Sequence, residues 1–223
     1  MKTLTFVTVS TLVCASALGA QKARDLTPYL IADRAAEVAL ARTAAPPDVS
    51  GKATVLVLTP KGYVEAAHGT NGFTCVVMRS FAAPAGDPGF WNPKTSAPHC
   101  FNPPAARTVL PAILAQIDWA LAGATPAEMN ARMKEAYAEK RLAMPAIGAM
   151  AYMLSPKQHL NDGHNPRWMP HVMFYYNRSL NAATFGAGGE TAPIISTDAN
   201  APEPMILIPV RVWSDGTPAD RTK

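Results

Sequence analysis

Hydrophobic and polar residues form separate blocks along the chain, some with the two-residue period of strands and others with helical spacing. Ala53–Thr59 is rich in β-branched residues and Phe73–Met78 repeats that character, so both are predicted strands. Pro60–Gly62 and the Gly-Thr-Asn-Gly run at 69–72 lie between them and predict turns, because Asn-Gly adopts positive φ at little cost. Further strands are predicted at Ala151–Leu154, His171–Tyr176 and Met205–Trp213.

Three segments with helical spacing carry start and stop signals, at residues 26–47, 103–123 and 125–142. Thr27 and Asn102 can cap the first two, and Pro111 predicts a kink or a broken turn inside the second. Thr125 and Glu128 form a capping box at the start of the third. Because strands and helices come in blocks, the pattern predicts an α+β fold, a single domain with a mostly antiparallel sheet packed by about three helices.

The first twenty residues have the order of a secretory signal peptide, with Lys2, an apolar run and then small residues. Cleavage is expected near Gly19 or Ala20, which assigns residues 1–20 to the leader and 21–223 to one domain with its core at about 27–213. No later segment has about 18 uninterrupted apolar residues, so no membrane span is expected in the mature chain. The protein is therefore predicted to be secreted or periplasmic.

Cleavage also removes Cys14 and leaves Cys75 and Cys100. An even cysteine count in an exported chain predicts one disulfide, whereas a free nucleophilic Cys75 is disfavoured by the oxidising compartment. The segment from Phe81 to Pro104 has six prolines and few periodic apolar positions, so it is predicted to be a loop tied to the sheet through Cys100. Phe90 and Trp91 are expected to anchor this loop on the core.

The charge balance argues against nucleic acid as a partner. Loss of Lys2 with the leader leaves 19 basic and 16 acidic residues, a formal net charge of +3. The basic residues are scattered and form no basic tract, so we expect no nucleic-acid binding. The expected partner is an unknown small molecule or another component of the envelope.

Candidate chemistry concentrates between His159 and Tyr176, which contains three of the five histidines. Imidazole and carboxylate groups are ligands for divalent transition metals, so His159, Asp162, His164 and His171 form a candidate metal set. The spacing matches no known cage, and the neighbouring Gly163 and Asn165-Pro166 predict a turn. A metal-binding protein or metal-dependent hydrolase is therefore kept as the alternative, and no cofactor is the primary expectation.

The same segment also suggests a binding surface. Arg167, Trp168 and His171 are candidate ligand-binding residues, because Arg and Trp are favoured in contacts. A serine hydrolase could use Ser80 or Ser155, with Asp162 or Asp198 behind a histidine, but the chain has no Gly-X-Ser-X-Gly elbow. The acidic residues of the third predicted helix are interpreted as a solvated face rather than as paired carboxylates for glycoside cleavage; they are Glu128, Glu135 and Glu139.

Several short motifs together resemble a group of exported bacterial hypothetical proteins. The motifs are GTNGFTC at 69–75, CFNP at 100–103, GAMAYML at 148–154, MPHVMFYY at 169–176 and ILIPVRVWSDG at 206–216. The resemblance implies one domain and a bacterial exported setting, and it implies no particular activity. The sequence therefore predicts a non-catalytic protein that binds a small ligand or a partner. An envelope interaction protein is a third possibility, which an exposed apolar patch near Phe90, Trp91 or Trp168 would favour.

Overall fold

The computed structural model describes residues 24–163, 166–176, 194–196 and 204–219, so the predicted leader lies outside the described residues. Within these ranges eight strands form one sheet, in the order β2-β1-β3-β4-β5-β6-β8-β7. Neighbouring strands are antiparallel except for β1 and β3, which are parallel. The predicted α+β domain with a mostly antiparallel sheet is confirmed. In the described part of the chain, no helix combines the length and apolarity needed to cross a bilayer.

Helices and strands come in blocks along the chain. The strands are β1 (Thr54–Thr59), β2 (Gly62–Ala67), β3 (Thr74–Met78), β4 (Ala97–Phe101), β5 (Met150–Met153), β6 (His171–Tyr175), β7 (Ile194–Ser196) and β8 (Met205–Pro209). The helices are α1 (Arg34–Arg42), α2 (Pro47–Ser50), α3 (Pro103–Thr108), α4 (Leu110–Leu121) and α5 (Pro126–Ala138), with 3₁₀ turns η1 (Thr27–Tyr29) and η2 (Ser80–Ala82).

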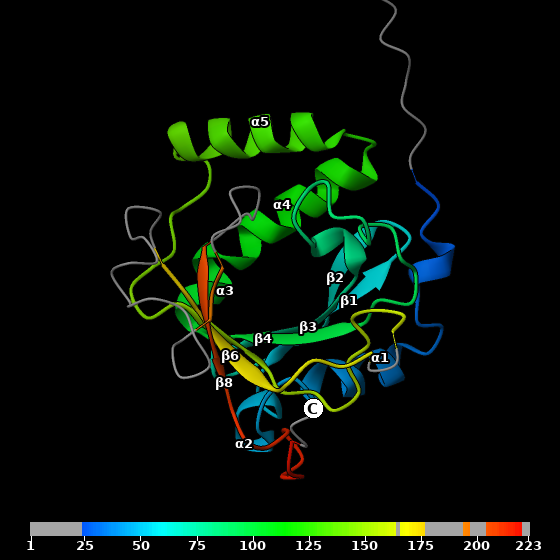
Figure 1. The fold of residues 1–223 in the computed structure, drawn as a ribbon, viewed down its shortest axis with the longest axis vertical. Helices are drawn as coiled ribbons and strands as arrows, with labels where there is room; N and C mark the ends of the chain where they lie inside the picture. Colours follow the sequence, from blue (N-terminus) through cyan, green and yellow to red (C-terminus); the bar gives the residue numbers. More distant parts are fainter. Residues whose placement is uncertain (1–23, 164–165, 177–193, 197–203, 220–223) are drawn as a thin grey trace, which may run out of the picture.

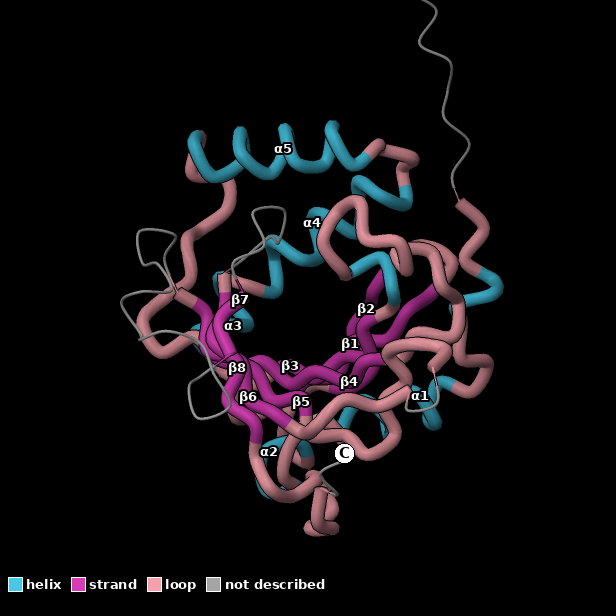
Figure 2. Tube along the Cα trace, viewed as in Figure 1, coloured by secondary structure: helices cyan, strands magenta, loops and turns pink. Residues whose placement is uncertain are grey.

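The sheet is curved, and different helices cover its two faces (Figure 1, Figure 2). α1 and α2 lie against one face, while α3 and α4 lie on the other side and α5 packs on the outside of α4. Side chains alternate between the two faces along each strand. Thus Cys75 and Val77 of β3 join the core beneath α1, whereas Val76 and Met78 join the larger core on the α4 side.

The predicted disulfide is confirmed, but its second cysteine does not lie in a loop. Cys75 of β3 is bonded to Cys100 of β4, directly opposite in the antiparallel register, with the Cα atoms 3.9 Å apart. The prediction of a loop from Phe81 to Pro104 is therefore wrong at Ala97–Phe101, which forms a central strand. Pro98 lies beyond the end of the β4–β5 ladder, which contains Cys100 and Phe101, so its missing N–H removes no bond there.

The first predicted helix is also divided. Thr27 begins only a 3₁₀ turn, and α1 begins later because the Asp33 carboxylate accepts a hydrogen bond from the N–H of Ala35. The interruption turns Tyr29 into the core, where it packs edge-on against Phe81. The helical periodicity alone did not show that Tyr29 would lie outside the helix.

The other helix signals are confirmed. Asn102 caps α3, and the chain breaks at Val109 before α4, next to Pro111 as predicted. Thr125 and Glu128 form the predicted capping box of α5. Besides β4, the strand β8 ends at Pro209 rather than Trp213, and neither β2 nor β7 was among the predicted strands.

A buried ion pair ties α1 to the end of β3. The Arg79 Nη2 atom lies 2.8 Å from Glu37 Oε1, and the two side chains are 2% and 1% exposed. Arg79 also donates to the carbonyl oxygens of Tyr29 and Val77, while Glu37 accepts from the N–H of Leu58. Both charges are thus compensated inside the protein, as burial of an ion requires.

Loss of the disulfide should destabilise the fold, because the unfolded chain then regains the entropy of a loop with a sequence separation of 25. The Cys75→Ala/Cys100→Ala variant is expected to lose about 3 kcal/mol of unfolding free energy, measured by urea denaturation. Reducing agent should lower the wild-type midpoint and leave the variant unchanged. Equal midpoints for oxidised and reduced wild type would contradict this prediction.

Removal of one member of the buried pair should be severe. Glu37→Ala leaves the Arg79 guanidinium buried without its counter-ion, so we expect a loss of about 3–5 kcal/mol in unfolding free energy. The matched control is Glu135→Ala, which breaks the surface pair between Glu135 and Arg141 and should have almost no effect. A similar loss in both variants would show that burial is not the cause.

Candidate functional site

A cavity of about 690 Å³ lies between the α4-side face of the sheet and the loop that follows β3. Residues of β3, β4, β5, β6 and β8 form its floor, Ile113 of α4 contributes to its wall, and the segment from Arg79 to Thr95 forms one side. Leu160, Asn161, Asp162 and Trp168, from the segment between β5 and β6, complete the lining. The cavity is thus built by strands from both halves of the sheet.

The floor of the cavity is mainly apolar. Four methionines line it, one from each of four strands: Met78, Met153, Met173 and Met205. Flexible thioether side chains adapt to irregular shapes and to different bound groups. Tyr175 adds a phenol whose hydroxyl lies 3.9 Å from the sulfur of Met173. Burial raises the pKa of Tyr175, so this hydroxyl stays protonated and donates to the Met173 sulfur.

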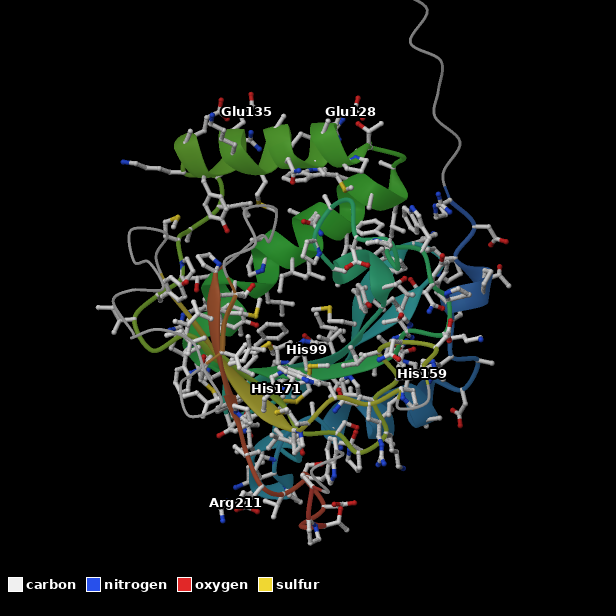
Figure 3. The ribbon with its side chains drawn as sticks, viewed as in Figure 1. His99, Glu128, Glu135, His159, His171 and Arg211 are labelled. Carbon is white, nitrogen blue, oxygen red and sulfur yellow. A yellow bond between two sulfur atoms is a disulfide. The ribbon has the colours of Figure 1, made fainter. Side chains whose placement is uncertain are left out.

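Two histidines stand in one row across the floor. Cys100 pairs with Tyr152 and Met153 pairs with His171, so the antiparallel register places His99, Met153 and His171 side by side on β4, β5 and β6. Directly opposed residues share a face of the sheet, and two strand spacings amount to about 10 Å. Figure 3 shows the labelled His99 and His171 close together on the sheet, with His159 apart from them.

Backbone hydrogen bonds determine which nitrogen of each ring carries the proton. The Nδ1 atom of His99 lies 2.8 Å from the carbonyl oxygen of Ala97, and that of His171 lies 2.8 Å from the carbonyl oxygen of Met169. A carbonyl oxygen only accepts, so Nδ1 is the donor in both rings. In the neutral ring, Nε2 is then a hydrogen-bond acceptor. Neither Nε2 atom has a hydrogen-bond partner among the residues that the structure describes.

Both imidazoles are held in the neutral form. Burial lowers the pKa of His99 from its ordinary value of 6.5 to about 4, and the charge of a protonated His171 would lower it further. Burial also lowers the pKa of His171, whose side chain is 2% exposed. The apolar surroundings disfavour the imidazolium because it would lose its hydration. Near pH 7 the cavity floor therefore presents two uncharged acceptors.

A polar cluster joins two loops at one edge of the cavity. The carboxylate of Asp162 accepts a hydrogen bond from the Asn92 amide at 3.1 Å, and it lies 3.3 Å from both Lys94 Nζ and His159 Nε2. These contacts, with the His159 hydrogen bond foremost, lower the pKa of Asp162 and keep it ionised. A two-way backbone pairing between Ser96 and His159 holds the same loops together.

The three predicted ligand-binding residues divide between two places. Trp168 and His171 both line the cavity, and their rings meet edge to face with centroids 4.7 Å apart. The backbone carbonyl of Trp168 accepts a hydrogen bond from the buried Gln158 amide, which holds the main chain at Trp168 in place. Arg167 instead lies with its guanidinium 5.6 Å from the centroid of the Trp213 ring and does not line the cavity.

The candidate metal set is only partly described. His159 and Asp162 lie together at the cavity edge, whereas His171 lies on the floor with Nδ1 bound to the backbone. His164 lies outside the described residues. Across the described ranges, no three or more His, Cys, Asp or Glu side chains form a group that could hold a metal ion.

The serines considered for a hydrolase occupy different surroundings. Ser155 is fully buried and its hydroxyl lies 2.6 Å from that of Thr43, so it joins the strand end to α1. Ser80 lines the cavity, and its hydroxyl has no hydrogen-bond partner in the described structure. Asp198 lies outside the described residues. On the outer helix, Glu128 and Glu135 point away from the fold, as Figure 3 shows.

Sequence reasoning missed His99 and the methionine lining. His99 was assigned to a loop, although the neighbouring Cys100 offered a signal. A disulfide between adjacent strands would have placed Ala97, His99 and Phe101 together on the opposite face from the cysteines. The strand methionines were not singled out, because they alternate along the strands like ordinary core residues.

The depressed pKa of His99 should make stability depend on pH. The unfolded chain binds the proton near pH 6.5 and the folded protein only near pH 4, so lowering the pH between these values favours unfolding. We expect wild type to lose about 1.4 kcal/mol of unfolding free energy per pH unit more than the His99→Gln variant in this window, measured by urea denaturation. Parallel stability curves for the two proteins would contradict the assignment.

Searches against protein-family models, curated proteins and solved structures find no significant match to this chain. What the cavity can bind therefore follows from the residues that line it.

Proposed function

We propose that this chain is an exported protein of the bacterial envelope that binds a small, largely apolar molecule in the cavity without transforming it. The observation that supports this proposal is the cavity. Its volume of about 690 Å³ falls within the range of roughly 300–1,000 Å³ that is typical of small-molecule sites. Such sites are mainly apolar with a few polar groups in defined places, and methionines with two imidazoles fit that description.

The exported setting has two separate supports. Residues 1–20 have the order of a secretory signal peptide, and the domain contains a disulfide in its core. The resemblance to exported bacterial proteins agrees with this setting. A binding protein of the envelope would use the disulfide to keep its cavity intact in an oxidising compartment.

The hydrogen bonds of the histidines favour binding over catalysis. A histidine that acts as a general base for a nucleophile is commonly oriented by a carboxylate and bonded to the nucleophile. Here both rings are oriented by backbone carbonyls, those of Ala97 and Met169. Within the described residues neither ring is hydrogen-bonded to a carboxylate or a hydroxyl. The arrangement suits fixed acceptors better than proton carriers.

The alternative of an envelope interaction protein has less support. This alternative would be favoured by an exposed apolar patch near Phe90, Trp91 or Trp168. Phe90 is only 5% exposed, and Trp91 packs edge-on against Phe90 and at a tilt against Phe81. Trp168 lines the cavity. These aromatic side chains therefore pack in the core or line the cavity, and they do not form a docking surface.

Ligand binding can be tested with N-phenyl-1-naphthylamine, an uncharged fluorophore whose emission rises in apolar surroundings. We expect saturable binding to the mature protein, with quenching of Trp168 because its indole lines the cavity. Leu207→Trp should weaken the affinity at least about tenfold, because Leu207 lines the cavity and the larger indole would occupy it.

The matched control is Ile208→Trp on the same strand. Ile208 is 40% exposed and alternates with Leu207, so its side chain lies on the opposite face of the sheet. This variant should bind the fluorophore as wild type does. Absence of saturable binding to wild type, or equal affinities for the two variants when circular dichroism shows both folded, would refute the cavity as the binding site.

A further inference from the structure

The two cavity histidines form a pair of fixed, uncharged acceptors. Each Nδ1–H is bonded to the carbonyl oxygen two residues earlier on its own chain segment, Ala97 for His99 and Met169 for His171. The acceptor atom in both rings is therefore Nε2. Since β4 and β6 both run antiparallel to β5, the two rings lean in the same direction and stand about two strand spacings, or roughly 10 Å, apart.

The charges around the cavity disfavour an anionic ligand. Arg79 is the only cationic side chain among the described lining residues, and its guanidinium is bound to Glu37 and to two backbone carbonyls. Asp87 and Asp162 also line the cavity, and both are exposed at its edge. Lys94 already balances the Asp162 carboxylate at 3.3 Å, so an anion would meet the Asp87 carboxylate at the entrance and find no unpaired positive charge inside.

A ligand without donors would also bind poorly. It would displace water from the two Nε2 atoms and leave both acceptors without hydrogen bonds in apolar surroundings, which is unfavourable. Sites built with buried hydrogen-bonding groups discriminate against analogues that lack the matching group. The row that contains His99, Met153 and His171 therefore selects for donors, with a thioether contact between them.

We infer that the cavity takes an uncharged, largely apolar compound that carries two hydrogen-bond donors, hydroxyl or N–H groups, one for Nε2 of His99 and one for Nε2 of His171. This inference rests on the proposed function and specifies its ligand class. The methionines and Trp168 contact the apolar body of the compound, and the two imidazoles determine its orientation along the row.

Three naphthalenes test the donor requirement on unmodified mature protein. They are 2-methoxynaphthalene with no donor, 2-naphthol with one and 2,6-dihydroxynaphthalene with one at each end. Isothermal titration at pH 7 should show affinity rising at each step, by about three- to tenfold for each added hydrogen bond. The anion 2-naphthoate should bind more weakly than 2-naphthol.

Histidine variants assign each step to its acceptor. His99→Leu and His171→Leu should each remove one of the two increases in affinity, so that the diol binds no better than 2-naphthol. The double variant should bind all three uncharged probes alike and retain its affinity for 2-methoxynaphthalene. His68→Leu is the matched control, because it removes an exposed imidazole that does not line the cavity, and it should keep both increases in affinity.

The outcomes separate this inference from the proposed function. Tight binding of N-phenyl-1-naphthylamine together with equal affinities for the three naphthalenes would overturn the donor requirement and leave the binding function in place. A gain at only one step would overturn the two-donor form, and tighter binding of 2-naphthoate would overturn the choice of an uncharged ligand. No binding of any probe would refute the proposed function itself.

Discussion

The pairing of β3 with β4 is the constraint on which the rest of the structure depends. The bond between Cys75 and Cys100 joins two directly opposed residues and places both on the face beneath α1. Side chains alternate along a strand, so a shift of one residue would move every side chain to the other face. With the cysteines on one face, His99 and Phe101 must face the other, where the cavity lies.

The electrostatics of the cavity follow from how each charge is compensated. Arg79 is neutralised by Glu37 from the other side of the sheet, so a buried cation is present without offering charge to a ligand. The imidazoles of His99 and His171 avoid charge because burial lowers both pKa values. The ionised Asp162 stays at the edge, where it joins two loops through Asn92. Formal charge is thus kept to the walls and the edge, and neutral acceptors occupy the floor.

Local signals in the sequence predicted those parts of the fold that depend on neighbouring residues. The capping box at Thr125 and the break before Pro111 both arise from contacts within a few residues, and both are confirmed. The prediction of a loop at Ala97–Phe101 failed for the opposite reason. The proline content of this segment indicates a loop, and its strand conformation comes from pairing with β3, which is far away in sequence. The break in the first helix likewise brings Tyr29 into contact with Phe81, a residue far away in sequence.

The sequence by itself determined the covalent bond, the fold class and the strand that carries His171, because cysteine count, block order and alternation are all visible along the chain. Only the tertiary structure decided that His99, Met153 and His171 share one row and that Arg167 lies outside the cavity. The reason is that a row across a sheet joins residues that are remote in sequence, and its membership is set by strand order and register. Side-chain types alone do not reveal either.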